Sequence, residues 1–499
     1  MSGRRLARNA LYNVLGLGLP LVVGVAALPV TVHALGDVRF GLLGLAWAVL
    51  GYVGALDLGL GRATTKYVAE YLAAGDEALL RNVGTLAVAS QTALGVVGGA
   101  LFALLTPFLV DHVLGVAPVL RAEARGMLLA LAVSVPFVVL AASLRAMLEA
   151  AQRFDLVNLI RTPTSAAVLV VPAIAASLGA TLPVIVLLLV GVRIVACAAS
   201  AAAIRRAIPV FRWTLALRWE TLRPLLGYGG WVSVSNVISP LLVYLERFLL
   251  AGLGGVAAVA YYTVPSEVVM RLLIVPAGLA GALFPALSAS GAGVGREGAG
   301  PIEQLLGRPL RFLLLILAPI VTALVVCAGP LLQIWLGEAY AARGTAAFAV
   351  LAVGVLINGL AHLPYTYLLG RGRPDLPAKF HLLELPLYAA AAWLLIRRWG
   401  VTGAALGWTL RVSMDAVLLV AAVWRVSGIS PVRLLGDRGG RALAAVLGLA
   451  AVGATCYSMA SQAALRYALV LVSLVGFAVA VWRFVLDDRE RAGLRTVLR

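Results

Sequence analysis

The chain of 499 residues is 62% hydrophobic and only 12% charged, and its formal net charge at pH 7 is +18. Soluble globular domains carry charged residues at about a quarter of their positions, so this composition excludes them and indicates a polytopic membrane protein. A basic excess of this size would indicate nucleic-acid binding in a soluble domain, but here the positions of the basic residues provide another explanation.

Long apolar segments occur along the whole chain. A helix needs about 20 apolar residues to cross the ~30 Å hydrocarbon core, and this criterion predicts about fourteen transmembrane helices. We therefore predict an all-α polytopic fold. The expected spans are 11–35, 40–62, 82–106, 124–147, 156–178, 182–204, 225–251, 256–287, 310–335, 345–369, 380–397, 402–424, 442–461 and 466–486.

The basic residues segregate between alternate loops. If the N-terminus is cytoplasmic, most of the 40 Lys and Arg residues fall in cytoplasmic loops or in the tail. This is the distribution that the positive-inside rule describes, and it accounts for the net charge without a nucleic-acid partner. The even number of spans then places the C-terminus in the cytoplasm as well.

The order of the spans predicts an internal repeat. Six spans return the chain to the cytoplasmic side, so two successive groups of six would form parallel six-helix repeats around an axis along the membrane normal. We predict an N-lobe at 1–218 with spans 1–6, a C-lobe at 219–433 with spans 7–12, and a C-terminal part at 434–499 with two further helices and a tail. The loops are too short for a soluble catalytic domain, which favours a transporter over an enzyme.

The stretch from Leu225 to Ala289 carries charged residues inside two predicted spans. These are Glu246, Arg247, Glu267 and Arg271. An ionised side chain at the bilayer centre costs about 2.5–3.5 kcal/mol on insertion scales, so these residues need a polar cavity or partners. We interpret the hairpin as one wall of a transport pathway.

Arg271 is the main candidate for contact with an anionic cargo. It lies one helical turn from Glu267, which would be its resting partner or a protonatable coupling group. The alternative is a structural ion pair inside the helix. Glu246 and Arg247 are adjacent and so point about 100° apart around the helix. One of them can face the pathway while the other pairs elsewhere, and Arg247 is a second candidate contact for an anionic cargo.

Asp57 and Arg62 lie near the cytoplasmic end of the second predicted span. Arg62 would either meet an anionic head group or anchor the helix end by snorkelling. Asp57 lies deeper and would be a proton site or a partner across the pathway. Asn13 and Asn236 lie in the first span of each predicted lobe, where each would contact polar groups of the cargo or form a hydrogen bond between helices.

Arg193 in span 6 and Arg411 with Asp415 in span 12 occupy equivalent places in the two predicted lobes. They would share a role in transport or brace contacts between helices. His381 and Glu384 begin span 11 near the cytoplasmic side, where an interfacial position is expected. The histidines show no HExxH or other metal-ligand spacing, so we expect neither a metal site nor a catalytic site.

Several segments resemble those of one family. They are GDVRFGLLGLA at 36–46, DLGLGRATTKYVAEY at 57–71, and SVSNVISPLLVYLERFLL followed by AVAYYTVPSEVVMRL. Together with Asn13 and the fourteen-span plan, they resemble the polysaccharide (O-antigen-type) flippases of the multidrug/oligosaccharidyl-lipid/polysaccharide exporter superfamily. The resemblance covers most of residues 1–430.

This resemblance implies a multi-pass transporter of a bacterial-type cytoplasmic (inner) membrane. Its cargo would be undecaprenyl-diphosphate-linked oligosaccharide, carried to the outer leaflet by alternating access for cell-surface polysaccharide assembly. The implied partners are the lipid-linked oligosaccharide, membrane lipids, and the polymerisation and glycosyltransferase machinery. No cofactor is implied, and energy would come from H⁺ or Na⁺ coupling and from the membrane potential.

Three alternatives remain open at this point. The first is a cation-coupled multidrug antiporter of the same superfamily. The second is a lipid II flippase, although that group resembles this chain less because it carries Arg in its first span and residues 11–35 contain none. The third is a membrane-embedded glycan enzyme, which the short loops disfavour.

Overall fold

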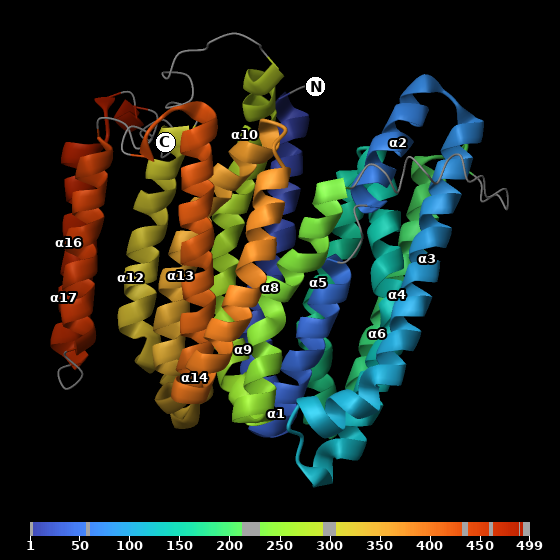
Figure 1. Ribbon diagram of the computed structural model, residues 1–499, viewed down its shortest axis with the longest axis horizontal. Helices are drawn as coiled ribbons and strands as arrows, with labels where there is room; N and C mark the ends of the chain where they lie inside the picture. Colours follow the sequence, from blue (N-terminus) through green and yellow to red (C-terminus); the bar gives the residue numbers. More distant parts are fainter. Residues whose placement is uncertain are drawn as a thin grey trace. The chain divides into compact units, whose positions relative to one another are not determined.

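The computed structural model is helical almost throughout the residues that it describes (Figure 1). These residues are 3–55, 60–211, 230–292, 306–431, 438–458, 463–488 and 490–492. They contain no β-strand. The all-α prediction is therefore confirmed.

Within the described ranges, twelve helical segments are long and apolar enough to cross a membrane. Two of them lie in helices that contain a break. Helix α1 (Gly3–Ala55) is interrupted at Gly36, and α14 (Asp375–Ser427) is interrupted at Gly400. Both glycines have positive φ, 69° and 52°, a conformation that residues with a Cβ rarely adopt. When the arms are counted separately, the helices agree with the predicted number of about fourteen spans.

The two arms of α14 run antiparallel and lie in close contact. A Cβ added at Gly403 would lie 2.0 Å from the carbonyl oxygen of Leu395, and one added at Gly407 would lie 3.2 Å from the Cα of Ala392. Only glycine permits such an approach of two backbones. The break at Gly400 therefore folds this part of the chain into a tight helical hairpin.

The chain divides into two compact units, Met1–Thr263 and Val264–Arg499. The boundaries predicted for the repeats, after 218 and after 433, lie outside the described residues. The first unit contains α1, α2 (Leu60–Ala74), α3 (Glu77–Phe108), α4 (Arg121–Ala150), α5 (Phe154–Ser177), α6 (Leu182–Ala207), α8 (Gly230–Gly254) and the first half of α9 (Val256–Met270).

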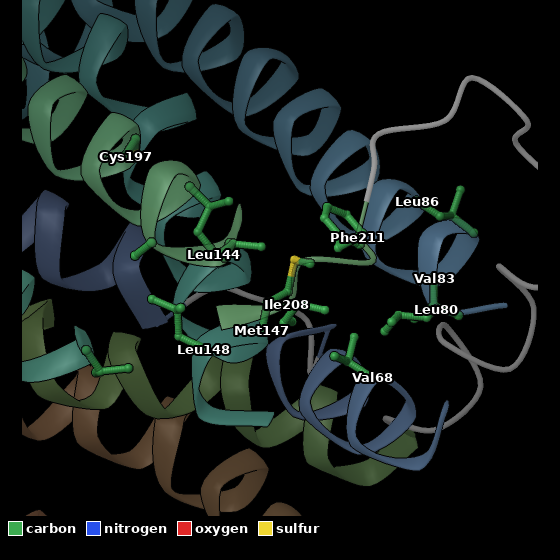
Figure 2. Packing of buried hydrophobic residues seen from close by; sticks show 13 residues of the cluster. Val68, Leu80, Val83, Leu86, Leu144, Met147, Leu148, Cys197, Ile208 and Phe211 are labelled. Atoms are coloured by element: carbon green, nitrogen blue, oxygen red, sulfur yellow. The ribbon is translucent and has the colours of Figure 1, made fainter. Parts of the chain in front are cut away.

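One hydrophobic core of the first unit lies between α2, α3, α4 and α6. It includes Val68, Leu80, Met147 and Phe211, which Figure 2 shows at close range. Phe211 follows α6 and packs so closely on α3 that a Cβ at Gly84 would lie 2.5 Å from its ring. The residue order thus places a glycine opposite the largest side chain of this cluster.

Other apolar side chains of the first unit point away from its core. On α3 they include Val97, Leu101, Leu104 and Phe108, all exposed. Spacings of three and four residues put them on one face of the helix. An apolar face of this kind suits contact with lipid, as expected for a membrane-spanning helix.

The second unit continues from α9 through a short 3₁₀ turn. Its elements are η3 (Arg271–Leu273), α10 (Ile274–Ala292), α12 (Arg308–Leu336), α13 (Glu338–Gly370), α14, α16 (Gly439–Ser458), α17 (Ala463–Ala480) and η5 (Val481–Val485). One core joins α10, α12, α13 and α14. A second core packs α16 and α17 onto α12 through residues such as Leu314, Val446 and Phe477.

An ion-pair cluster ties the segment after η5 to the start of α12. The Glu490 carboxylate is fully buried and pairs with Arg308, at 2.9 Å, and with Arg311. The backbone N–H of Glu490 donates to Asp487 and holds the pKa of that carboxyl below its ordinary value. Glu490 is therefore a buried carboxylate whose charge is compensated by two arginines.

Candidate functional site

Arg271 lies where the regular α-helical winding of the eighth predicted span stops. Helix α9 ends at Met270, and Arg271 begins the 3₁₀ turn that leads into α10. Prolines at 265 and 276 lie on either side of this turn. Each lacks an N–H donor, and a proline inside a helix favours a local change of winding. A stretch of 3₁₀ helix in the middle of a span is a common position for a hinge.

The Arg271 guanidinium is held only loosely. Its Nη2 lies 3.5 Å from Oε2 of Glu267, and the two side chains are 37% and 28% exposed. A pair at this distance and exposure contributes little to stability. Arg271 can therefore exchange Glu267 for another anion without a large loss of folding free energy.

Glu246 and Arg247 on α8 are both buried in the first unit. The Glu246 carboxylate accepts a hydrogen bond of 3.0 Å from the Tyr262 hydroxyl. The Arg247 guanidinium lies 5.4 Å from the centre of the Tyr244 ring. Only 1% of Glu246 and 4% of Arg247 is exposed. In this conformation both charges are enclosed, so neither offers an open anion site.

A second group of charges lies inside the α14 hairpin. Arg411 and Asp415, on the second arm, are buried, and so are His381 and Glu384 on the first arm. Nη1 of Arg411 lies 3.8 Å from Oε2 of Glu384. The sequence allows an interfacial position for His381 and Glu384, and the structure shows both side chains buried.

Comparison with known proteins places this chain in a family. Residues 6–290, more than half of the chain, match the family described as "Polysaccharide biosynthesis protein". The chain belongs to this family. The matched region includes Glu246, Arg247, Glu267 and Arg271 and ends before the α14 hairpin begins.

One relative and two solved structures are also similar to this chain. An O-antigen transporter by name, from Shigella flexneri, is 29% identical over 415 residues, which cover 83% of this chain and 96% of that protein. An inward-facing multidrug resistance transporter of the MATE family and MOP superfamily superposes with a TM-score of 0.69 at 16% identity, covering 83% of this chain and 98% of the other.

The lipid II flippase MurJ, in an inward closed conformation, superposes with a TM-score of 0.65 at 11% identity, covering 96% of this chain and 99% of MurJ. At these identities the solved structures show a shared fold alone. The family and the Shigella relative support a membrane transporter, and the fold is one that transporters of the MOP superfamily share. The resemblance noted in the sequence is therefore confirmed.

The other predicted site residues lie away from Arg271 in the sequence. Arg193 lies on α6 and is half-buried, and its Nε has no hydrogen-bond partner among the described residues. Arg62 lies on α2, and Asn13 and Asn236 lie on α1 and α8; their side chains are outside the described part. Asp57 falls in a segment that the structure does not describe.

The contact between Glu384 and Arg411 was not predicted from the sequence. A signal for this contact exists once Gly400 is recognised as the turn of a helical hairpin. Gly403 lies opposite Leu395 and Gly407 lies opposite Ala392. Continuing this antiparallel register brings Glu384 level with the segment that carries Arg411 and Asp415.

Proposed function

We propose that this transporter moves undecaprenyl-diphosphate-linked oligosaccharide from the cytoplasmic to the outer leaflet by alternating access. Its place would be a bacterial-type cytoplasmic membrane, with both termini in the cytoplasm and with the product feeding cell-surface polysaccharide assembly. The observation that carries the proposal is Arg271, a half-exposed and loosely paired guanidinium within a span that the family match includes.

A diphosphate is a suitable partner for such a guanidinium. Arg presents a planar fork of donors that binds two phosphate oxygens at once, and hydrogen bonds between charged groups are about twice as strong as neutral ones. The weak contact with Glu267, at 3.5 Å, would be replaced by this stronger one when cargo arrives. Glu267 would then lose its contact with Arg271.

The membrane potential would assist outward movement of an anion. An inside-negative potential contributes about 2.3 kcal/mol per charge per 100 mV, so a cargo with about two negative charges gains about 4.6 kcal/mol. Coupling to H⁺ or Na⁺ would add to this. The chain contains no GxxxxGK[ST] sequence, the motif of one large class of nucleotide-driven proteins.

One break within a predicted span supports a change of conformation during transport. It is the 3₁₀ turn that begins with Arg271, whereas Gly36 and Gly400 mark turns between separate helical arms. Alternating access requires helices that bend at a few points while their packed parts remain rigid. Arg247 is enclosed in this conformation and would contact cargo only in another one. Arg62, Asn13 and Asn236 stay candidate cargo contacts on the sequence alone.

Translocation in reconstituted vesicles tests the proposal. The cargoes would be a defined undecaprenyl-diphosphate-linked oligosaccharide, lipid II, and a lipophilic cation, each with the wild type and with Arg271→Ala. Arg153→Ala is the matched control, because Arg153 is an exposed arginine that pairs with its neighbour Asp155.

We expect movement of the oligosaccharide lipid, a strong loss with Arg271→Ala and wild-type rates with Arg153→Ala. Movement of the lipophilic cation alone would contradict the proposal and support a multidrug antiporter. Movement of lipid II in preference to the oligosaccharide lipid would equally overturn the proposed cargo.

A further inference from the structure

The α14 hairpin encloses more acidic than basic charge. Glu384 has no exposed surface, and Asp415 and Arg411 are 7% and 8% exposed. His381 lies one turn from Glu384 on the same arm and is 7% exposed. Two carboxylates thus share one guanidinium in a place that water hardly reaches.

The polar atoms of this group are not satisfied by the described part of the protein. Both carboxylate oxygens of Glu384, Oδ1 of Asp415 and Nδ1 of His381 have no hydrogen-bond partner there. The nearest Arg411 nitrogen lies 3.8 Å from Glu384, beyond hydrogen-bond distance. The charge of Asp415 acts on both Glu384 and His381.

Packing partners do not supply the missing positive charge. The element with extensive contact to α14 is α13, whose titratable residues are Glu338, Tyr340, Arg343, His362, Tyr365 and Tyr367. Glu338 and Arg343 lie in its first two turns, and Nδ1 of His362 hydrogen bonds to its own helix at Asn358. Among the described residues, the charge balance of the site is therefore set by the four residues of the hairpin itself.

One arginine can compensate one carboxylate. A second carboxylate buried close to the first cannot remain ionised cheaply, and closely spaced acids in such a place share a proton. Two acids and one guanidinium become neutral when they hold one proton and His381 is uncharged. The site then fits the low-polarity surroundings of a transmembrane hairpin.

We propose that Glu384 and Asp415 share one exchangeable proton beside Arg411, and that this proton is the coupling ion of the transporter. In the exchange, the O–H bond of the carboxylic acid breaks, the proton passes to Nδ1 of His381 or to water, and the acid becomes a carboxylate. The coupling role rests on the proposed function, whereas proton binding does not.

A proton suits this site better than a metal cation. Arg411 already occupies the position of a cation between the acids, and hard metal cations need several oxygen ligands. In the part of the chain that is described, no three His, Cys, Asp or Glu side chains come together as a metal site. Glu384 is nine residues from the start of α14, about 14 Å along the helix, so a short path through His381 would connect it to one membrane surface.

Infrared spectroscopy of the full chain in lipid nanodiscs tests proton binding without any cargo. We expect a carboxylic-acid C=O band at pH 7 that disappears as the pH is raised. Glu384→Gln and Asp415→Asn should each abolish it, because the remaining acid then pairs with Arg411. Glu490→Gln is the matched control, because Glu490 is equally buried but fully paired, and it should leave the band unchanged.

Two results would overturn the proton site. One is a spectrum in which neither Glu384→Gln nor Asp415→Asn changes a carboxylic-acid band between pH 5 and pH 9. The other is a band that Na⁺ at constant pH removes, since this would identify a metal cation as the ligand. If one variant fails to fold, the other gives the same comparison independently.

Transport with an imposed pH gradient tests the coupling role. Reversing the gradient should change the wild-type rate severalfold, whereas Glu384→Gln should give a ratio close to one. If the band is present but wild type and variant respond alike to the gradient, proton coupling at this site is wrong. If wild type moves no oligosaccharide lipid, the proposed cargo fails, and the infrared result still decides the proton site.

Discussion

Two loose carboxylate–guanidinium pairs of the second unit differ in one property, their exposure. Glu267 and Arg271 lie 3.5 Å apart, and about a third of each side chain is exposed. Glu384 and Arg411 lie 3.8 Å apart and are almost completely buried. The exposed pair can exchange its partner for another anion. The buried group is closed to such a partner from solvent, so a proton is the ion it can most readily exchange.

Removing the buried arginine should have the largest effect on stability. Arg411→Leu leaves Glu384 and Asp415 without a guanidinium, and breaking a buried pair in this way costs about 3–5 kcal/mol. Thermal unfolding in detergent at neutral pH would measure the loss. Adding Glu384→Gln to the same chain should restore much of it, and a double variant as unstable as Arg411→Leu would contradict the charge balance.

Removing the exposed arginine should act on transport instead. Arg271→Ala is expected to lower translocation of the oligosaccharide lipid about 10- to 100-fold, since a charged hydrogen bond contributes about 1.5–3 kcal/mol. Its unfolding free energy should change by less than about 1 kcal/mol, because exposed pairs contribute little. A large loss of stability would show that Arg271, like Arg411, has a structural role.

Neutralising the partner of Arg271 should have a smaller effect in the opposite direction. Glu267→Gln removes the anion that competes with a diphosphate, and an exposed pair is worth about 0.2–1 kcal/mol. Binding of a soluble diphosphate-linked sugar, measured by calorimetry, should tighten up to about fivefold. Weaker binding would indicate that Glu267 orients Arg271 rather than competing with the cargo.

Arg193→Gln should have the smallest effect. The sequence places Arg193 and Arg411 at equivalent positions, but Arg193 is only half-buried and forms no ion pair with a described residue. We expect stability within about 0.5 kcal/mol of wild type, the usual range for such a site, and an unchanged response to a pH gradient. Loss of the response to the pH gradient would show that Arg193 and Arg411 have equivalent roles, as the sequence predicts.

The sequence by itself determined that the chain is a helical membrane protein, because an apolar segment of sufficient length must span the bilayer in whatever order the helices pack. It also located the family-like segments and the pair at Glu267 and Arg271, which lie one turn apart on a single helix. Contacts of this kind depend only on helical geometry.

The tertiary structure alone decided which charges are enclosed and which remain exposed. Glu384 meets Arg411 because Gly400 reverses the chain and because Gly403 and Gly407 let the two arms touch. Spacing within one helix cannot show how far that helix is rotated toward its neighbour, and this rotation separates an exposed arginine from a buried one.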